Sequence, residues 1–113
     1  MAFDARDPYD AAALYDMWLN CQGCTRTFDF EPDKPIGLDY YHDIGQRAKQ
    51  ERWVIREQPG EEDEVDGIAW QVLCPACAAR HGIRPDHRLR ARAHPAIEEI
   101  RQSLQRAREL VAA

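Results

Sequence analysis

Four cysteines are the residues in this 113-residue chain whose types and spacing point most directly to chemistry. They form two pairs of the same spacing, Cys21-Gln-Gly-Cys24 and Cys74-Pro-Ala-Cys77, with 49 residues between the pairs. In a Cys-x2-Cys turn both thiolates reach one ion, and two such turns supply the four sulfurs of a tetrahedral Zn²⁺ site. The spacing therefore predicts one structural zinc ion bound by Cys21, Cys24, Cys74 and Cys77.

This pattern resembles the zinc-ribbon superfamily, in which two hairpins each offer a Cys pair to one structural zinc. It is also similar to small bacterial or phage proteins that join a Cys-pair hairpin, a helix and a Cys-Pro-x-Cys strand end. The likeness covers residues 17–30 and 53–83, most closely the segment 70–78. Compact ribbons separate their pairs by roughly 15–20 residues. The longer interval here implies an insertion, and four thiolates imply a metal that stabilises the fold.

Two other uses of the cysteines stay open. Rubredoxin also holds iron with two Cys-x2-Cys turns, but Gly normally follows each pair there, whereas Thr25 and Ala78 follow here. The second pair also lies after a strand and before a possible helical turn, as a glutaredoxin-type redox pair does. Only 36 residues follow Cys77, which is too few for the remaining strands of that fold. Zinc is the favoured interpretation.

The histidines offer weaker alternatives. A zinc-bracketed HNH nuclease needs His and Asn between its Cys pairs, but His42 is the only histidine in that interval and Asn20 precedes it. We interpret His42 as a surface or helix-packing residue. His81, four residues after Cys77, could replace a cysteine as ligand, and we interpret it as a partly exposed turn residue. The sequence therefore predicts no catalytic residue and a protein that is not an enzyme.

Hydrophobic periodicity places the Cys pairs among hairpins and helices. Asp7 and Pro8 are typical of a helix start, and residues 17–30 alternate as in a hairpin bent around the first pair. The same reasoning predicts a helix at 39–52, strands at 53–57 and 68–74 around a solvated acidic loop, a turn at 78–83 and a helix at 95–111. We predict a single zinc-binding α+β domain over residues 1–113, with its core at 15–83. Its zinc-ribbon-like antiparallel hairpins carry an inserted helix and N- and C-terminal helices.

Charge is distributed unevenly along the chain. The net charge is −5, with 16 acidic and 7 basic residues in residues 1–66 but 4 acidic and 8 basic in the remainder. The N-terminus carries acids where a secretory signal needs basic and then apolar residues. No apolar run is long enough to span a bilayer. We therefore expect a cytoplasmic protein without a membrane partner, whose cysteines stay reduced.

A basic segment at residues 80–92 is the candidate partner-contact surface, through Arg80, Arg84, Arg88, Arg90 and Arg92. Guanidinium groups in this density bind phosphates in many nucleic-acid-binding proteins, but an overall negative charge opposes non-specific DNA binding. The last helix carries an apolar stripe from Ile97 to Val111 at heptad spacing. Its first expected use is core packing and its second is homodimerisation.

These features favour a non-enzymatic structural-zinc module with a regulatory or adaptor role, which presents a surface to a macromolecular partner, most simply a protein. The alternative is a nucleic-acid-binding transcriptional or RNA-associated factor that uses the segment 80–92. A thiol redox protein is the third hypothesis. Affinity that falls steeply with salt distinguishes the nucleic-acid hypothesis.

Overall fold

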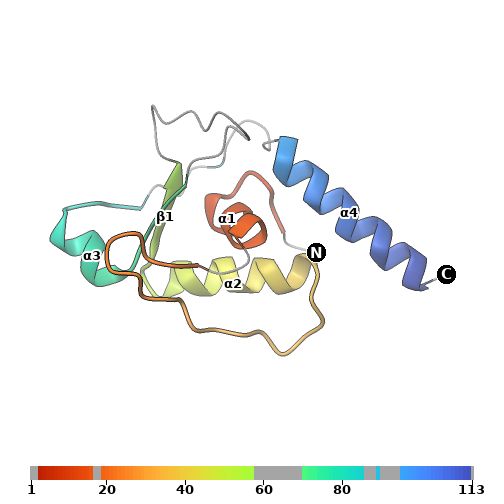
Figure 1. The fold of residues 1–113 in the computed structure, drawn as a ribbon, viewed down its shortest axis with the longest axis horizontal. Helices are drawn as coiled ribbons and strands as arrows, with labels where there is room; N and C mark the ends of the chain where they lie inside the picture. Colours follow the sequence, from red (N-terminus) through yellow and green to blue (C-terminus); the bar gives the residue numbers. More distant parts are fainter. Residues whose placement is uncertain (1–2, 17–18, 58–69, 86–88, 90–94, 113) are drawn as a thin grey trace.

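The computed structural model of the chain describes residues 3–16, 19–57, 70–85, 89 and 95–112. Within these residues the elements follow one another as α1 (Pro8–Asp16), α2 (Leu38–Gln50), β1 (Val54–Glu57), β2 (Trp70–Leu73), α3 (Pro75–Arg80) and α4 (Pro95–Ala112) (Figure 1). The fold is α+β, with one antiparallel hairpin and flanking helices, as the sequence predicts. The inserted helix between the first Cys pair and the hairpin is also confirmed.

Helix α1 begins where the sequence predicts. The Asp7 carboxylate accepts a hydrogen bond from the backbone N–H of Tyr9 at 2.9 Å, which makes Asp7 the N-cap and Pro8 the first helical residue. Every side chain from Pro8 to Leu14 is buried, including the three successive alanines. Such small side chains allow neighbouring elements to approach α1 closely from several sides.

Helix α2 packs across α1, and a glycine sets their separation (Figure 1). Tyr41, Ile44, Gly45 and Ala48 form the buried face of α2, as the periodicity predicts. A Cβ atom added at Gly45 would lie only 2.6 Å from the backbone oxygen of Tyr9. The two backbones are therefore in contact at this point, and only glycine fits there.

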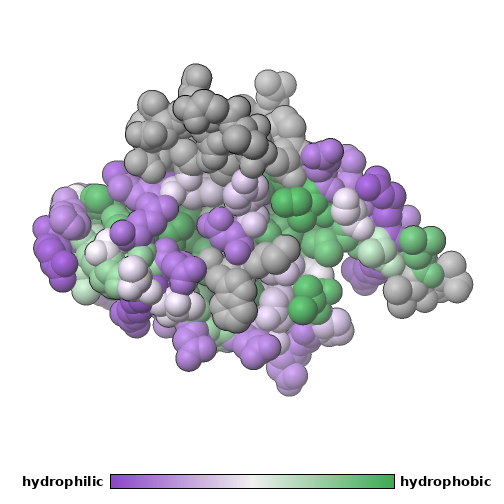
Figure 2. Space-filling view, in the orientation of Figure 1, coloured by the Kyte–Doolittle hydropathy of each residue, from purple (hydrophilic) through white to green (hydrophobic). Residues whose placement is uncertain are grey.

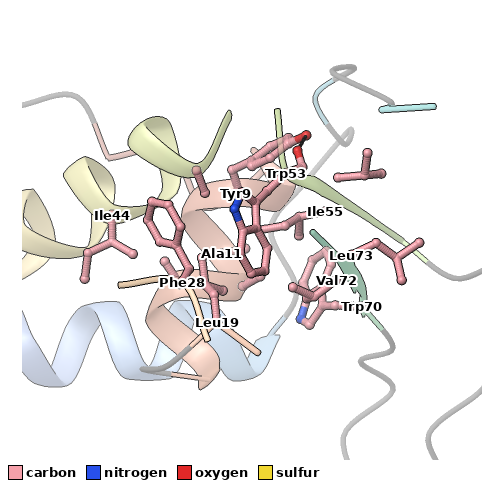
Figure 3. Packing of buried hydrophobic residues seen from close by; sticks show 14 of the residues in the cluster. Tyr9, Ala11, Leu19, Phe28, Ile44, Trp53, Ile55, Trp70, Val72 and Leu73 are labelled. Carbon is pink, nitrogen blue, oxygen red and sulfur yellow. Dashed lines mark hydrogen bonds between the residues drawn. The ribbon is translucent and has the colours of Figure 1, made fainter. Parts of the chain in front are cut away.

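The β1–β2 hairpin closes the other side of the core. Its register pairs Val54 with Leu73 and Ile55 with Val72, and all four side chains are buried. Successive pairs lie on opposite faces of the hairpin, and β1 contacts α1. Trp53, immediately before β1, packs its ring against Phe28 with 5.4 Å between centroids and an interplanar angle of 70° (Figure 3). The Tyr9 hydroxyl donates a hydrogen bond of 2.7 Å to the Trp53 carbonyl, which ties α1 to the start of β1.

Two local predictions differ from the structure. Residues 25–30 do not form a regular strand, because only a single antiparallel bridge joins Asn20 and Thr27. The turn expected at 78–83 is instead the end of α3, which already begins at Pro75 and stops before Gly82, where φ is +65°. The cause is Pro75, which suits the first helical position and starts the helix at the second Cys pair. The predicted acidic loop lies outside the described residues.

Helix α4 contacts α1 and α2 only through its N-terminal half. Ile97 is fully buried, Ile100 and Leu104 are half-buried, and every side chain from Gln105 to Leu110 is exposed. The stripe therefore serves core packing from Ile97 to Leu104. Among the described helices, none combines the length and apolar character needed to cross a membrane.

Candidate metal centre

The first Cys pair lies in a tight turn closed by backbone hydrogen bonds. The Cys21 N–H donates to the Arg26 carbonyl at 2.7 Å, and the Thr25 N–H donates to the Cys21 carbonyl at 2.9 Å. Thr25 has φ +65°, in the left-handed region that glycine usually occupies in such turns. Rubredoxin normally has glycine at the position that follows each Cys pair. Thr25 adopts the left-handed conformation of such a glycine, so its presence does not change the backbone of this turn.

The second Cys pair has a different local structure. Cys74 follows β2 directly and is the N-cap of α3, with an extended backbone at φ −69° and ψ 163°, while Cys77 lies inside the helix. Pro75 occupies the first helical position. One pair is thus presented by a turn and the other by a strand end and a helix start, so the two pairs are not equivalent turns.

Residues between the first two cysteines attach their turn to β2. The Gln22 N–H donates to the Val72 carbonyl at 2.9 Å, and the Gln22 side-chain Nε2 donates to the Trp70 carbonyl at 2.7 Å. Gly23 lies against Cys77, where a Cβ would meet Sγ at 3.1 Å. These contacts bring together two segments that are about fifty residues apart in sequence.

The four sulfur atoms converge. Those of Cys21, Cys24, Cys74 and Cys77 all lie within 4.8 Å of one another, and the Cys24 and Cys74 Sγ atoms are 3.7 Å apart. A tetrahedral site with Zn–S bonds of about 2.3 Å has sulfur–sulfur edges of about 3.8 Å. All four cysteines are free thiols, three of them buried and Cys24 exposed. The donor set is positioned to hold one metal ion.

The electrostatics of the cluster favour a bound cation. Burial alone would raise the pKa of the Cys21 thiol, but backbone N–H groups of Cys74, Gly23 and Cys24 outweigh it and lower that pKa to about 6. The Cys77 N–H likewise lowers the pKa of Cys74. Burial, together with the neighbouring thiols, raises the pKa of Cys77 to about 12. The first thiolate forms readily and the last does not, and a divalent cation removes this repulsion between sulfurs.

The structure describes two of the five arginines predicted as a partner-contact surface. Arg80 and Arg84 are exposed, whereas Arg88, Arg90 and Arg92 lie outside the described residues. His81 is exposed at the C-terminus of α3 and is not part of the sulfur cluster.

His42 pairs with a residue of α1. Its Nδ1 lies 2.7 Å from a carboxylate oxygen of the buried Asp10, which confirms the interpretation of His42 as a helix-packing residue. Asp10 is the residue whose polar role sequence reasoning missed. A carboxylate in the first turn of a helix is typical of capping, and no local spacing pairs it with a histidine 32 residues later.

Comparisons with known protein families, with characterised proteins and with solved structures find no match to this chain. The inference of function therefore rests on the geometry of the cysteine cluster and on the surfaces around it.

Proposed function

We propose that the chain is a non-enzymatic zinc module in which one Zn²⁺, held by the four cysteines, fixes the 21–24 turn to β2 and α3 and so presents their surfaces to a protein partner. The convergence of four sulfurs within 4.8 Å is the observation that supports the metal. Because a rigid surface loses little conformational entropy on binding, a structural ion improves affinity without touching the partner.

A structural role for the ion follows from the donor set. Four thiolates fill a tetrahedral coordination shell and leave no position for water or substrate. Burial of Cys21, Cys74 and Cys77 also opposes a thiol-exchange function, because an attacking thiolate needs to be accessible. Zinc is preferred to iron because zinc is the usual ion of structural four-cysteine sites in proteins.

Metal content tests this proposal directly. Protein purified without chelator should contain one zinc per chain by plasma mass spectrometry, and its four thiols should react with a thiol reagent only after a chelator is added. Absence of metal together with a fast-reacting thiol would contradict the structural site and favour the redox hypothesis. One iron with visible absorption would identify the chain as an electron-transfer protein instead.

A protein partner is favoured by exposed apolar side chains outside the metal centre. Ile36, Leu89 and Leu110 are each more than half exposed. Burial of such side chains by a partner would contribute favourably to binding. A regulatory or adaptor role in the cytoplasm is the function that this combination supports.

Nucleic acid is the second candidate, and one feature of the metal end favours it. The described segments 19–28 and 70–85, which carry all four cysteines, contain no Asp or Glu but include the exposed Arg26, Arg80 and Arg84. The acidic residues are concentrated elsewhere in the chain, so the overall charge of −5 does not describe this end. Phosphate contacts by three arginines would make binding strongly salt-dependent.

Fluorescence anisotropy with labelled single- and double-stranded oligonucleotides separates the two candidates. Nucleic-acid binding predicts measurable affinity that weakens steeply between low and physiological salt and that Arg80→Glu/Arg84→Glu abolishes. Arg6→Glu, at an exposed position near the acidic N-terminal helix, is the matched control. No binding at low salt would leave the protein-partner function as the proposal.

A further inference from the structure

The C-terminal half of α4 forms a projecting arm, defined here as residues 105–110. α4 leaves the body at an angle and ends beyond α1 and α2 (Figure 1). All six of these side chains are exposed, and Leu110 is 79% exposed. The arm continues a helix whose N-terminal part packs on the body, and its exposed side chains are accessible to another molecule.

The arm combines apolar and basic side chains. At 100° per residue, Leu104 and Ala107 continue the buried stripe of α4, and Arg108 lies beside them on the flank. Within the described part of the chain Arg108 has no acidic partner. Figure 2 shows hydrophobic surface where α4 meets the body and again near its C-terminal end. A complementary surface should be acidic and carry an apolar centre.

The chain carries such a surface at the start of α2. Asp33, Ile36, Asp39 and Asp43, with Lys34, form what we call the acidic ledge. Lys34 Nζ lies 2.5 Å from an Asp43 carboxylate oxygen, and Asp39 lies one turn before Asp43 on the same face of α2. Ile36, between Lys34 and Asp39 in the sequence, is 70% exposed. Asp33 and Asp39 have no ion-pair partner among the described residues.

Pairing of two α4 helices along their stripes is a poor alternative. Ile97 is already fully buried within its own chain, so the N-terminal end of the stripe is not free. Antiparallel pairing centred on Leu104 would also place Arg108 opposite Ile100 of the other copy, which brings a charged side chain onto the apolar stripe. The arm and the ledge, in contrast, have opposite charge.

We infer that two copies of this chain form a symmetric dimer in which the arm of each copy docks on the acidic ledge of the other. Arg108 then faces ledge carboxylates, and the apolar side of the arm covers Ile36. A two-fold axis makes the contact twice and so doubles the buried area toward the roughly 1,200–2,000 Å² of stable interfaces. The second copy of the chain is then one protein partner of the kind that the proposed function requires. The contact between the two copies does not involve the metal ion.

Sedimentation velocity of the metal-loaded full chain tests the dimer. The expected result is a dimer at micromolar concentration whose dissociation constant rises with salt, because the contact includes opposite charges. Arg108→Glu and Asp39→Arg should each weaken the dimer by about tenfold or more through like-charge repulsion. The double variant Arg108→Glu/Asp39→Arg should recover a substantial part of that loss.

Arg106→Glu is the matched control, because residue 106 is two positions from Arg108 and points to the opposite side of α4. It makes the same charge change and should leave the dimer intact. Ile36→Ser tests the apolar centre without disturbing the core, since Ile36 is exposed. A chain that stays monomeric, or equal effects of the 106 and 108 variants, would overturn the inference. Zinc content and circular dichroism, measured on the same samples, report separately on the proposed metal site.

Discussion

His42 on α2 holds the buried carboxylate of Asp10 on α1, with Nδ1 2.7 Å from the carboxylate oxygen. The same carboxylate accepts hydrogen bonds from the Gln46 side chain at 2.8 Å and from the Asp4 backbone N–H at 3.0 Å. The Asp10 side chain is only 1% exposed. A buried carboxylate with three donors links the N-terminal segment, α1 and α2 in one polar network.

This network predicts a specific pH dependence of stability. Burial raises the pKa of Asp10, and the bonds from His42, Gln46 and Asp4 only partly offset that effect. A raised pKa in the folded state means that the stability contributed by Asp10 is complete below the ordinary Asp value and is lost as pH rises through the folded pKa. Asp10→Asn removes this titration. Urea unfolding in excess zinc should show wild-type stability falling relative to the variant as pH rises above about 4.

The difference in unfolding free energy between wild type and Asp10→Asn removes the pH effects that both proteins share, including protonation of the metal ligands. A difference in unfolding free energy that stays constant across this pH range would contradict the raised pKa of Asp10. A difference of the opposite sign would show that the hydrogen bonds outweigh burial.

The contact between α1 and α2 at Gly45 should be sensitive to any added side chain. Gly45→Ala places a Cβ about 2.6 Å from the Tyr9 carbonyl oxygen. The helices must separate, so we expect a loss of about 1–3 kcal/mol in unfolding free energy. Gly37→Ala, at the N-cap of the same helix, is the control, because its Cβ would meet no atom within 4 Å and its φ is 173°. Chemical denaturation should find a smaller loss for the control, about 1 kcal/mol or less, which reflects only the poorer capping by alanine.

The hydrogen bond from Gln22 to β2 should contribute to the affinity of the site for its metal ion. Its side chain donates to the Trp70 carbonyl and so orients the turn that carries Cys21 and Cys24. Gln22→Ala retains all four ligands but loses this support, and loss of such outer contacts typically weakens metal binding about 10–100-fold. Competition with a chromophoric chelator measures the affinity. Gln50→Ala, on the exposed end of α2, should match wild type, and equal affinity of the two variants would contradict the role of Gln22.

Metal removal should affect the two ends of the protein differently. The turn at 21–24 is held by few backbone bonds and exposes residues 22–27, so it depends on the ion. Helices α1 and α2 instead pack against each other and against β1. Amide exchange after chelation should therefore lose protection at Gln22, whose N–H binds Val72, and retain it at Ala11, whose N–H binds Asp7. Simultaneous loss at both amides would show that the metal supports the whole fold.

Much of the architecture is predictable from local pattern. Asp7 and Pro8 mark the start of α1, the spacing of Tyr41, Ile44 and Ala48 defines the buried face of α2, and Pro95 opens α4. These signals are local because a cap or an amphipathic face depends on residues within one or two turns. Residues 25–30 show the limit of such signals, since alternation alone does not provide a strand with a hydrogen-bonding partner.

The identity of the ligands can be predicted from local sequence, because Cys-x2-Cys spacing brings two sulfurs of one pair together. The fold brings the two pairs to each other, because Gln22 binds β2 across nearly fifty residues. It also decided that Thr25 adopts a left-handed conformation and that Cys77 lies in a helix. The pairing of His42 with Asp10 and the free half of α4 have the same origin. Both features depend on which surfaces lie next to each other once the core has packed. The spacing of residues along the chain does not encode this arrangement.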